Sequence, residues 1–145
     1  MQIKTKLKLK EMKTIIVILE KSEENYSAFI PTLEGCIATG ESLQKVKQNI
    51  LEATEFHLDG MRLEGLDIPE AFQNGYTFVY KIDMESLFEW FSGVLTKSGI
   101  SKLTGMNQSL VSQYANGLKK PGPKQTKKIQ EAIHNFGEEL LSIQL

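Results

Sequence analysis

Apolar residues recur with two different periods along this chain, and the change of period divides it into two parts. Up to residue 83, short apolar or alternating runs surround one long helical segment, which is typical of a small sheet with a helix. Beyond residue 83, several short segments with helical spacing follow one another. A chain of 145 residues has room for one ordinary domain or two small ones. We therefore expect an α+β protein with two modules, 13–83 and 84–145, after a basic leader at 1–12.

Three short strands are expected at the start of the front module. The run Lys13–Glu20 is apolar at every position from Ile15 to Leu19, which is typical of a strand that is covered on both faces. Turn residues at 22–25 separate it from the alternating run Tyr26–Ile30, and the two runs predict a hairpin. Cys36–Thr39, which lies between two glycines, predicts the third strand.

One long helix and a fourth strand complete the front module. Ser42 is a typical N-cap residue, and the apolar residues after it recur at helical spacing, so we expect a helix from Leu43 to Leu63. A loop with Pro and Gly at 65–75 follows, and the alternation of Tyr76–Ile82 then predicts a strand. The order β-β-β-α-β predicts a small α+β layer.

Several motifs of the front module resemble those of the HicB antitoxin domain. They are Tyr26–Pro31, Leu33–Cys36, Thr39–Leu43 and Ile68–Pro69. The resemblance implies a truncated ribonuclease H-like fold that binds a HicA-type toxin, a small basic ribonuclease with a catalytic histidine. Inhibition would then be occlusion of that histidine. The start of the helix departs from the family, because Gln44–Val46 stands where a double acidic-alanine pattern is usual.

The back module is expected to be a bundle of four short helices. Asp83, Thr96 and Asn107 are candidate N-caps of the first three, and Gly105 and Gly117 are expected to end the second and third. The first helix is expected to contain the apolar residues Leu87, Phe88, Trp90, Phe91, Val94 and Leu95. In the second helix Ile100 and Leu103 are expected to face inward. The apolar residues of the last two helices are Leu110, Val111 and Tyr114, and then Ile129, Ala132, Ile133, Phe136, Leu140 and Leu141. A tight glycine turn between the second and third helices is typical of a helix-turn-helix.

The same stretch is similar to the Cro/C1-type (XRE) repressor domain. The motifs that carry the similarity are Leu95–Thr96, Ile100–Leu103, Gly105–Ser109, Val111–Tyr114, Asn116–Gly117 and Lys119–Pro121. The resemblance implies that the third helix enters the major groove of DNA. The implied DNA-binding residues are Thr96, Lys97, Asn107, Gln108, Ser109, Ser112, Gln113, Asn116, Lys119 and Lys120.

Each of these residue types suits a contact with DNA. Gln and Asn amides can pair with the edge of adenine, and lysines attract phosphate without regard to sequence. Thr96 and Lys97 would hold the backbone together with the free amides at the start of a helix. Gln113 stands where the family often has Arg, so strong guanine recognition is not expected there. Helix capping is the alternative role of Asn107, and shaping a turn is that of Asn116.

Charge separates the two modules. Residues 13–83 hold 6 Lys and Arg against 12 Asp and Glu, a balance of −6, whereas residues 84–145 hold 7 against 5, a balance of +2. All seven of those lysines lie between Lys97 and Lys128, a stretch without any acid. A purely basic segment is typical of a polyanion-binding surface, so the two modules are expected to have different partners.

Two enzyme hypotheses fit the residues poorly. Ribonuclease H-like enzymes hold magnesium with carboxylates, for which the candidates are Glu20, Glu52, Glu55 and Asp83, but the wholly apolar first strand lacks the usual Asp. Cys36 and His57 could be a nucleophile and base, yet no third orienting group is evident. We expect a protein that is not an enzyme, with no catalytic residue, metal or cofactor.

These patterns together predict an antitoxin that also represses its own operon. Its partners would be operator DNA in the major groove, a HicA-like toxin and a second copy of the chain, because helix-turn-helix proteins generally bind paired half-sites. No apolar run approaches the ~20 residues of a membrane span, so a cytoplasmic protein is expected. The alternative is a stand-alone transcriptional regulator whose front module binds a small ligand or mediates oligomerisation.

Overall fold

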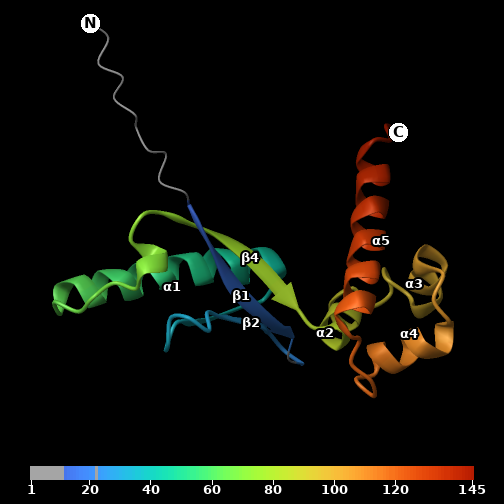
Figure 1. Ribbon diagram of the computed structural model, residues 1–145, viewed down its shortest axis with the longest axis horizontal. Helices are drawn as coiled ribbons and strands as arrows, with labels where there is room; N and C mark the ends of the chain where they lie inside the picture. The colour runs from blue at the N-terminus through green and yellow to red at the C-terminus, as the bar shows by residue number, and fades with distance from the viewer. Residues whose placement is uncertain (1–11, 22) are drawn as a thin grey trace, which may run out of the picture. The chain divides into compact units, whose positions relative to one another are not determined.

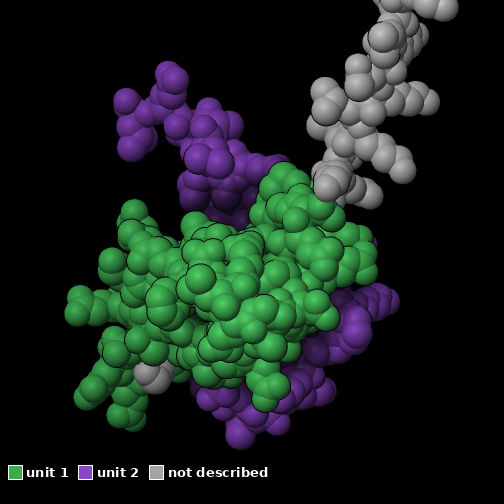
Figure 2. All heavy atoms as spheres, turned by 90° about the vertical axis from the view of Figure 1, so that its left-hand side faces the viewer, with its two compact units in different colours: residues 1–81 green, residues 82–145 purple. Residues whose placement is uncertain are grey.

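The computed structural model describes residues 12–21 and 23–145, which form two compact units (Figures 1 and 2). The first unit ends at Lys81 and the second begins at Ile82, two residues before the expected boundary. Of the predicted basic leader at 1–12, all but Met12 lies outside the described residues, as does Ser22 of the first predicted turn.

Four strands form one sheet in the order β3-β2-β1-β4. They are β1 (Lys13–Lys21), β2 (Tyr26–Phe29), β3 (Ile37–Gly40) and β4 (Tyr76–Ile82). The strands β1, β2 and β3 pair antiparallel, with Ile18 opposite Phe29 and Phe29 opposite Ile37. In Figure 1 the arrows of β1 and β4 point the same way, because the chain crosses over through a helix before β4.

The helix α1 (Leu43–Leu63) has the predicted bounds. The Ser42 hydroxyl accepts a hydrogen bond from the Lys45 amide at 3.1 Å, which satisfies one of the free amides of the first turn. One stripe of α1 is buried, namely Val46, Ile50, Thr54 and Leu58. This stripe covers one face of the sheet, whose buried residues include Ile15, Val17, Leu19 and Ala28.

The prediction that β1 is covered on both faces is wrong. Ile15, Val17 and Leu19 are buried, but Ile16 between them is 40% exposed and Ile18 is half-buried. Successive side chains of a strand point to opposite faces, so the second set lies on the face away from α1. A short apolar run cannot by itself distinguish a two-sided from a one-sided strand.

A short 3₁₀-helix, η1 (Glu70–Phe72), lies in the segment predicted as loop. Its Phe72 side chain is buried and makes an edge-to-face contact with the Tyr76 ring, with centroids 5.1 Å apart. This aromatic contact adds η1 to the core of the first unit.

The second unit contains four helices among its residues 82–145. They are α2 (Met84–Trp90), α3 (Lys97–Thr104), α4 (Gln108–Ala115) and α5 (Pro123–Leu141). Side chains of Asp83, Thr96 and Asn107 cap the first three, as predicted, and Gly105 ends α3 with a left-handed φ of 71°. Five buried residues form the core, namely Ile100, Met106, Val111, Tyr114 and Ile129.

Two expectations for the second unit are wrong. The apolar residues up to Leu95 do not all belong to the first helix, because α2 ends at Trp90 and turns follow, with Gly93 at a φ of 81°. Leu103 does not face inward, since it is 37% exposed and lines the edge of an apolar groove together with Val94 and Phe136.

Two glycines of the first unit give a matched test of how closely β3 packs against α1. We predict that Gly40→Ala lowers the free energy of unfolding by about 1–3 kcal/mol, because the added Cβ would lie 2.6 Å from the backbone nitrogen of Val46. Gly60→Ala, in α1 with no atom within 4 Å of the added Cβ, should instead raise it by about 0.5–1 kcal/mol. Urea unfolding of both variants measures the difference, and equal effects would contradict the close approach of β3 to α1.

Candidate functional site

The helix α4 has one polar, solvent-facing side. Its residues Val111 and Tyr114 are buried in the core of the second unit, whereas Gln108, Ser109 and Gln113 are exposed. Because each helical residue turns by about 100°, five of the predicted DNA-binding residues fall within an arc of about 140° that excludes the buried ones. These five are Gln108, Ser109, Ser112, Gln113 and Asn116.

The other predicted residues next to α4 make contacts of their own. Asn107 Oδ1 accepts a hydrogen bond from the Ser109 amide at 2.8 Å, and Thr96 Oγ1 accepts one from the Gly99 amide at 3.0 Å. Lys97 Nζ donates to Asn116 Oδ1 at 3.2 Å, which connects the start of α3 to the end of α4. Sequence reasoning missed this contact, because a pair separated by 19 residues leaves no periodic signal.

Exposed lysines follow α4 directly. The backbone carbonyl of Gln113 accepts hydrogen bonds from the amides of Leu118 at 3.0 Å and Lys119 at 3.2 Å. This turn places Lys119 and Lys120 next to the end of the helix, and both side chains are exposed. Further exposed lysines are Lys102, Lys124, Lys127 and Lys128, of which Lys127 forms an ion pair with Glu131 at 3.7 Å.

An apolar groove of about 550 Å³ lies between α3 and α5. Val94, Leu103 and Phe136 are among its lining residues and are all partly exposed. The apolar surface continues along the end of α5, where Leu140 is 54% and Leu141 is 88% exposed. Exposed apolar surface of this extent is typical of a protein–protein contact.

The first unit also has an unusual exposed face, which lies on α1. Phe56 is 82% and Leu63 is 90% exposed, and both lie on the side of the helix opposite its buried stripe. Glu52 and Asp59 are exposed on the same side. Sequence reasoning missed this face, although Phe56 and Leu63 lie outside the apolar stripe that predicted the helix.

The acids of the first unit are concentrated in one segment. Residues 52–70 contain six acids and one cation, a balance of −5, whereas residues 13–51 contain five acids and four cations, a balance of −1. All six acids of the 52–70 segment are exposed. The negative charge of the first unit is therefore a local property of the second half of α1 and the loop that follows it.

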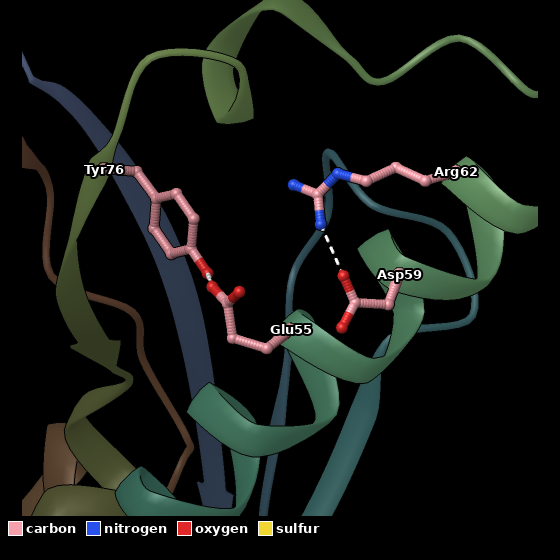
Figure 3. A network of polar contacts seen from close by, with 4 residues as sticks. All are labelled: Glu55, Asp59, Arg62 and Tyr76. Atoms are coloured by element: carbon pink, nitrogen blue, oxygen red, sulfur yellow. Dashed lines mark hydrogen bonds and ion pairs between the residues drawn. The ribbon is translucent and has the colours of Figure 1, made fainter.

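Several polar contacts involve α1, and one of them joins its second half to the sheet. The Tyr76 hydroxyl of β4 donates a short hydrogen bond to Glu55 Oε1, and Figure 3 shows the phenol turned toward that carboxylate. Arg62 pairs with Asp59 along the helix at 2.6 Å. Nearer the start of α1, Lys47 Nζ lies 4.5 Å from the centroid of the Tyr80 ring.

Burial and the Glu55 carboxylate raise the pKa of the Tyr76 phenol well above its ordinary value of 10.0. Burial is the larger cause, and the hydrogen bond to Glu55 adds to it because a phenolate could not donate. Burial also raises the pKa of the Tyr80 phenol. Both phenols therefore lose their protons at a higher pH in the folded protein than an ordinary tyrosine does.

The residues of the two enzyme hypotheses have other contacts. Glu55 accepts from Tyr76, and Asp83 caps α2 through a hydrogen bond from the Ser86 amide at 2.7 Å. Cys36 is buried, with its Sγ 3.5 Å from Thr54 Oγ1. Within residues 12–21 and 23–145, no three His, Cys, Asp or Glu side chains come together as a metal site requires. Over the same ranges, no helix is long and apolar enough to cross a bilayer.

Comparison with known proteins identifies the family. Residues 14–89, just over half of the 145, match the model of a HicB-like antitoxin of bacterial toxin–antitoxin systems. The chain belongs to the HicB-like antitoxin family. The matched region contains the whole sheet from Thr14, the helix α1 with its exposed acidic face, and most of α2.

Individual proteins are also similar in sequence to this HicB-like chain. A UPF0150 protein of Helicobacter pylori is 38% identical over 52 residues, which cover 36% of this chain and 72% of the relative. A UPF0150 protein of Synechocystis is 34% identical over 62 residues, covering 42% and 78%. An uncharacterized 14.9 kDa protein of Haemophilus phage HP1 is 29% identical over 55 residues, which are 38% of this chain and only 41% of that relative.

The contact between Tyr76 and Glu55 predicts a pH dependence of stability. The folded pKa of Tyr76 lies above the unfolded value of 10.0. The phenol therefore contributes fully to the free energy of unfolding below pH 10, and this contribution is lost as the pH rises further. We predict that Tyr76→Phe costs about 1 kcal/mol at neutral pH and makes the loss of stability above pH 10 shallower. Urea unfolding from pH 8 to 11 measures this, and parallel curves for the two proteins would contradict it.

Proposed function

We propose that this chain is the antitoxin of a type II toxin–antitoxin system that neutralises a HicA-type, mRNA-cleaving ribonuclease and represses its own operon. In this proposal the first unit binds the toxin and the second binds operator DNA. The observation that carries the proposal is the union on one chain of a HicB-like match at 14–89 with a polar face on α4 beside an acid-free lysine segment.

The geometry of α3 and α4 supports the DNA-binding part. Two eight-residue helices are joined through Gly105 and Met106, and Asn107 then caps the second, as in a helix-turn-helix. With Val111 and Tyr114 in the core, α4 would enter the major groove with its polar side toward the bases. Gln108 and Gln113 would pair with adenine edges, with Ser109 and Ser112 between them.

Cations around α4 would supply the contacts with phosphate. Lys119 and Lys120 would bind the backbone at the end of α4, in a manner that does not depend on base sequence. At the other side, the free amides at the start of α3 would bind a phosphate with Thr96 and Lys97. In that state Lys97 would exchange its hydrogen bond with Asn116 for a phosphate oxygen.

Charge and family membership support the toxin-binding part. An antitoxin acts by binding, so the first unit would cover the catalytic histidine and the RNA surface of the toxin without reacting with either. A unit whose exposed acids exceed its cations would attract a basic ribonuclease and compete with its RNA.

Operator binding by paired half-sites would in addition require a homodimer or higher oligomer. The apolar groove between α3 and α5 is the surface that we assign to this self-association.

Co-expression of the chain with the product of the adjoining reading frame tests the proposal. The expected result is a complex that copurifies and in which the ribonuclease no longer cleaves RNA. If no protein copurifies while the chain still binds its promoter, the chain is a stand-alone transcriptional regulator instead.

Substitutions on α4 should separate the two activities. We predict that Gln108→Ala with Gln113→Ala weakens binding to the promoter fragment about 30-fold or more, since each lost pair costs at least about 1 kcal/mol. Gln130→Ala, at an exposed position of α5, is the matched control and should bind normally. Mobility shift and toxin copurification measure the two activities. Loss of both in a folded double variant would contradict the division of roles.

A further inference from the structure

Two large apolar side chains stand on the solvent side of α1. Phe56 and Leu63 are seven residues apart, so they lie about 10.5 Å apart along the helix axis and differ by only about 20° around it. They are 82% and 90% exposed, the two largest exposed fractions among the large apolar side chains of the first unit that the structure describes. The helix cannot turn to bury them, because Val46, Ile50 and Leu58 on its other side fill the core.

One further large apolar residue is exposed just after the helix. Leu66 follows α1 by three residues and is 52% exposed. Phe56 and Leu63 themselves are apolar side chains in a polar surround, which is the arrangement of anchors in protein interfaces. We call the solvent side of α1, made of Glu52, Phe56, Asp59 and Leu63, the α1 face.

Charge indicates what kind of partner the α1 face can take. It lies within residues 52–70, which carry five of the six excess negative charges of 13–83. Nucleic acid and anionic membrane lipid would be repelled by such a surface. A basic protein with an apolar cleft is complementary to it, because its cations would meet Glu52 and Asp59 while the cleft receives Phe56 and Leu63.

The α1 face is also held rigidly, which favours tight binding. Tyr76 binds Glu55 from β4, and Thr54 donates to the Ile50 carbonyl at 2.7 Å within the buried stripe. Ser42 caps the start of the helix. A surface that is already ordered loses little conformational entropy when it binds.

We propose that the α1 face is where the toxin docks, with Phe56 and Leu63 inserted into an apolar cleft of the toxin and the surrounding acids paired with its cations. This inference rests on the proposed function, which assigns a toxin to the first unit, and adds the surface and the residues. It makes α1, rather than an edge or the open face of the sheet, the element that inhibits.

Two double variants of the full chain test the proposal, each with a matched control. Phe56→Ala with Leu63→Ala removes the apolar anchors and keeps good helix formers, and Ile37→Ala, 64% exposed on β3, is its control. Glu52→Lys with Asp59→Lys reverses two charges on the α1 face. Glu23→Lys with Glu24→Lys, in the exposed turn after β1, makes the same change of net charge elsewhere.

The measurement is the dissociation constant for a catalytically inactive form of the toxin, the product of the adjoining reading frame, at low and high salt. We expect each double variant to weaken binding about tenfold or more, while both controls bind like the wild type. The charge variant should also show a weaker dependence on salt. Circular dichroism and promoter binding establish that each variant is folded.

The other outcomes overturn the proposal in distinguishable ways. If the wild type binds toxin and the α1-face variants bind equally well, the docking surface is elsewhere and the proposed function stands. If only Ile37→Ala weakens binding, the toxin docks on the open face of the sheet. If the anchor variant changes the mass of the chain alone in light scattering, the α1 face joins two copies. If the wild type binds no toxin, the proposed function fails as well.

Discussion

The burial of one stripe of α1 against one face of the sheet is the contact on which the first unit depends. Val46, Ile50 and Leu58 are fully buried there, and the sheet contributes Val17 and Ala28. Only one side of a helix can pack against a sheet. The residues of the buried stripe therefore also determine which residues, on the opposite side, face solvent. The outward position of Phe56 and Leu63 is therefore a direct consequence of how the core packs.

In the second unit, too, the buried side of a helix determines which residues are exposed, but here the exposed residues are polar and basic. Because Val111 and Tyr114 are buried, the Gln and Ser residues of α4 face outward. The lysine-bearing segment around and after α4 contains no Asp or Glu. The two units thus present surfaces of opposite charge, one apolar and acidic, the other polar and basic. In the proposed function these opposite charges would suit the two partners, because the acidic surface would repel DNA and the basic surface would repel a basic toxin.

Local signals predicted most of the secondary structure but not the contacts between elements. The bounds of α1 and β4 were predicted correctly, because Ser42, helical spacing and strict alternation act over a few residues. The two-sided burial of β1 and the inward position of Leu103 were wrong, since burial depends on what packs against an element. The Tyr76–Glu55 and Lys97–Asn116 contacts join residues that are 21 and 19 positions apart, and contacts over such distances leave no periodic pattern in the sequence. The α1 face was visible in the sequence only as apolar residues outside the predicted stripe.

The central claim is that DNA and toxin bind to separate surfaces on separate units. Hydrogen-exchange mass spectrometry of the full chain, alone, with its promoter fragment and with inactive toxin, tests it most directly. The account predicts that DNA slows exchange within residues 96–120 and that toxin slows it within residues 52–70, with neither footprint extending into the other. A toxin footprint on α4, or a DNA footprint on α1, would contradict the account.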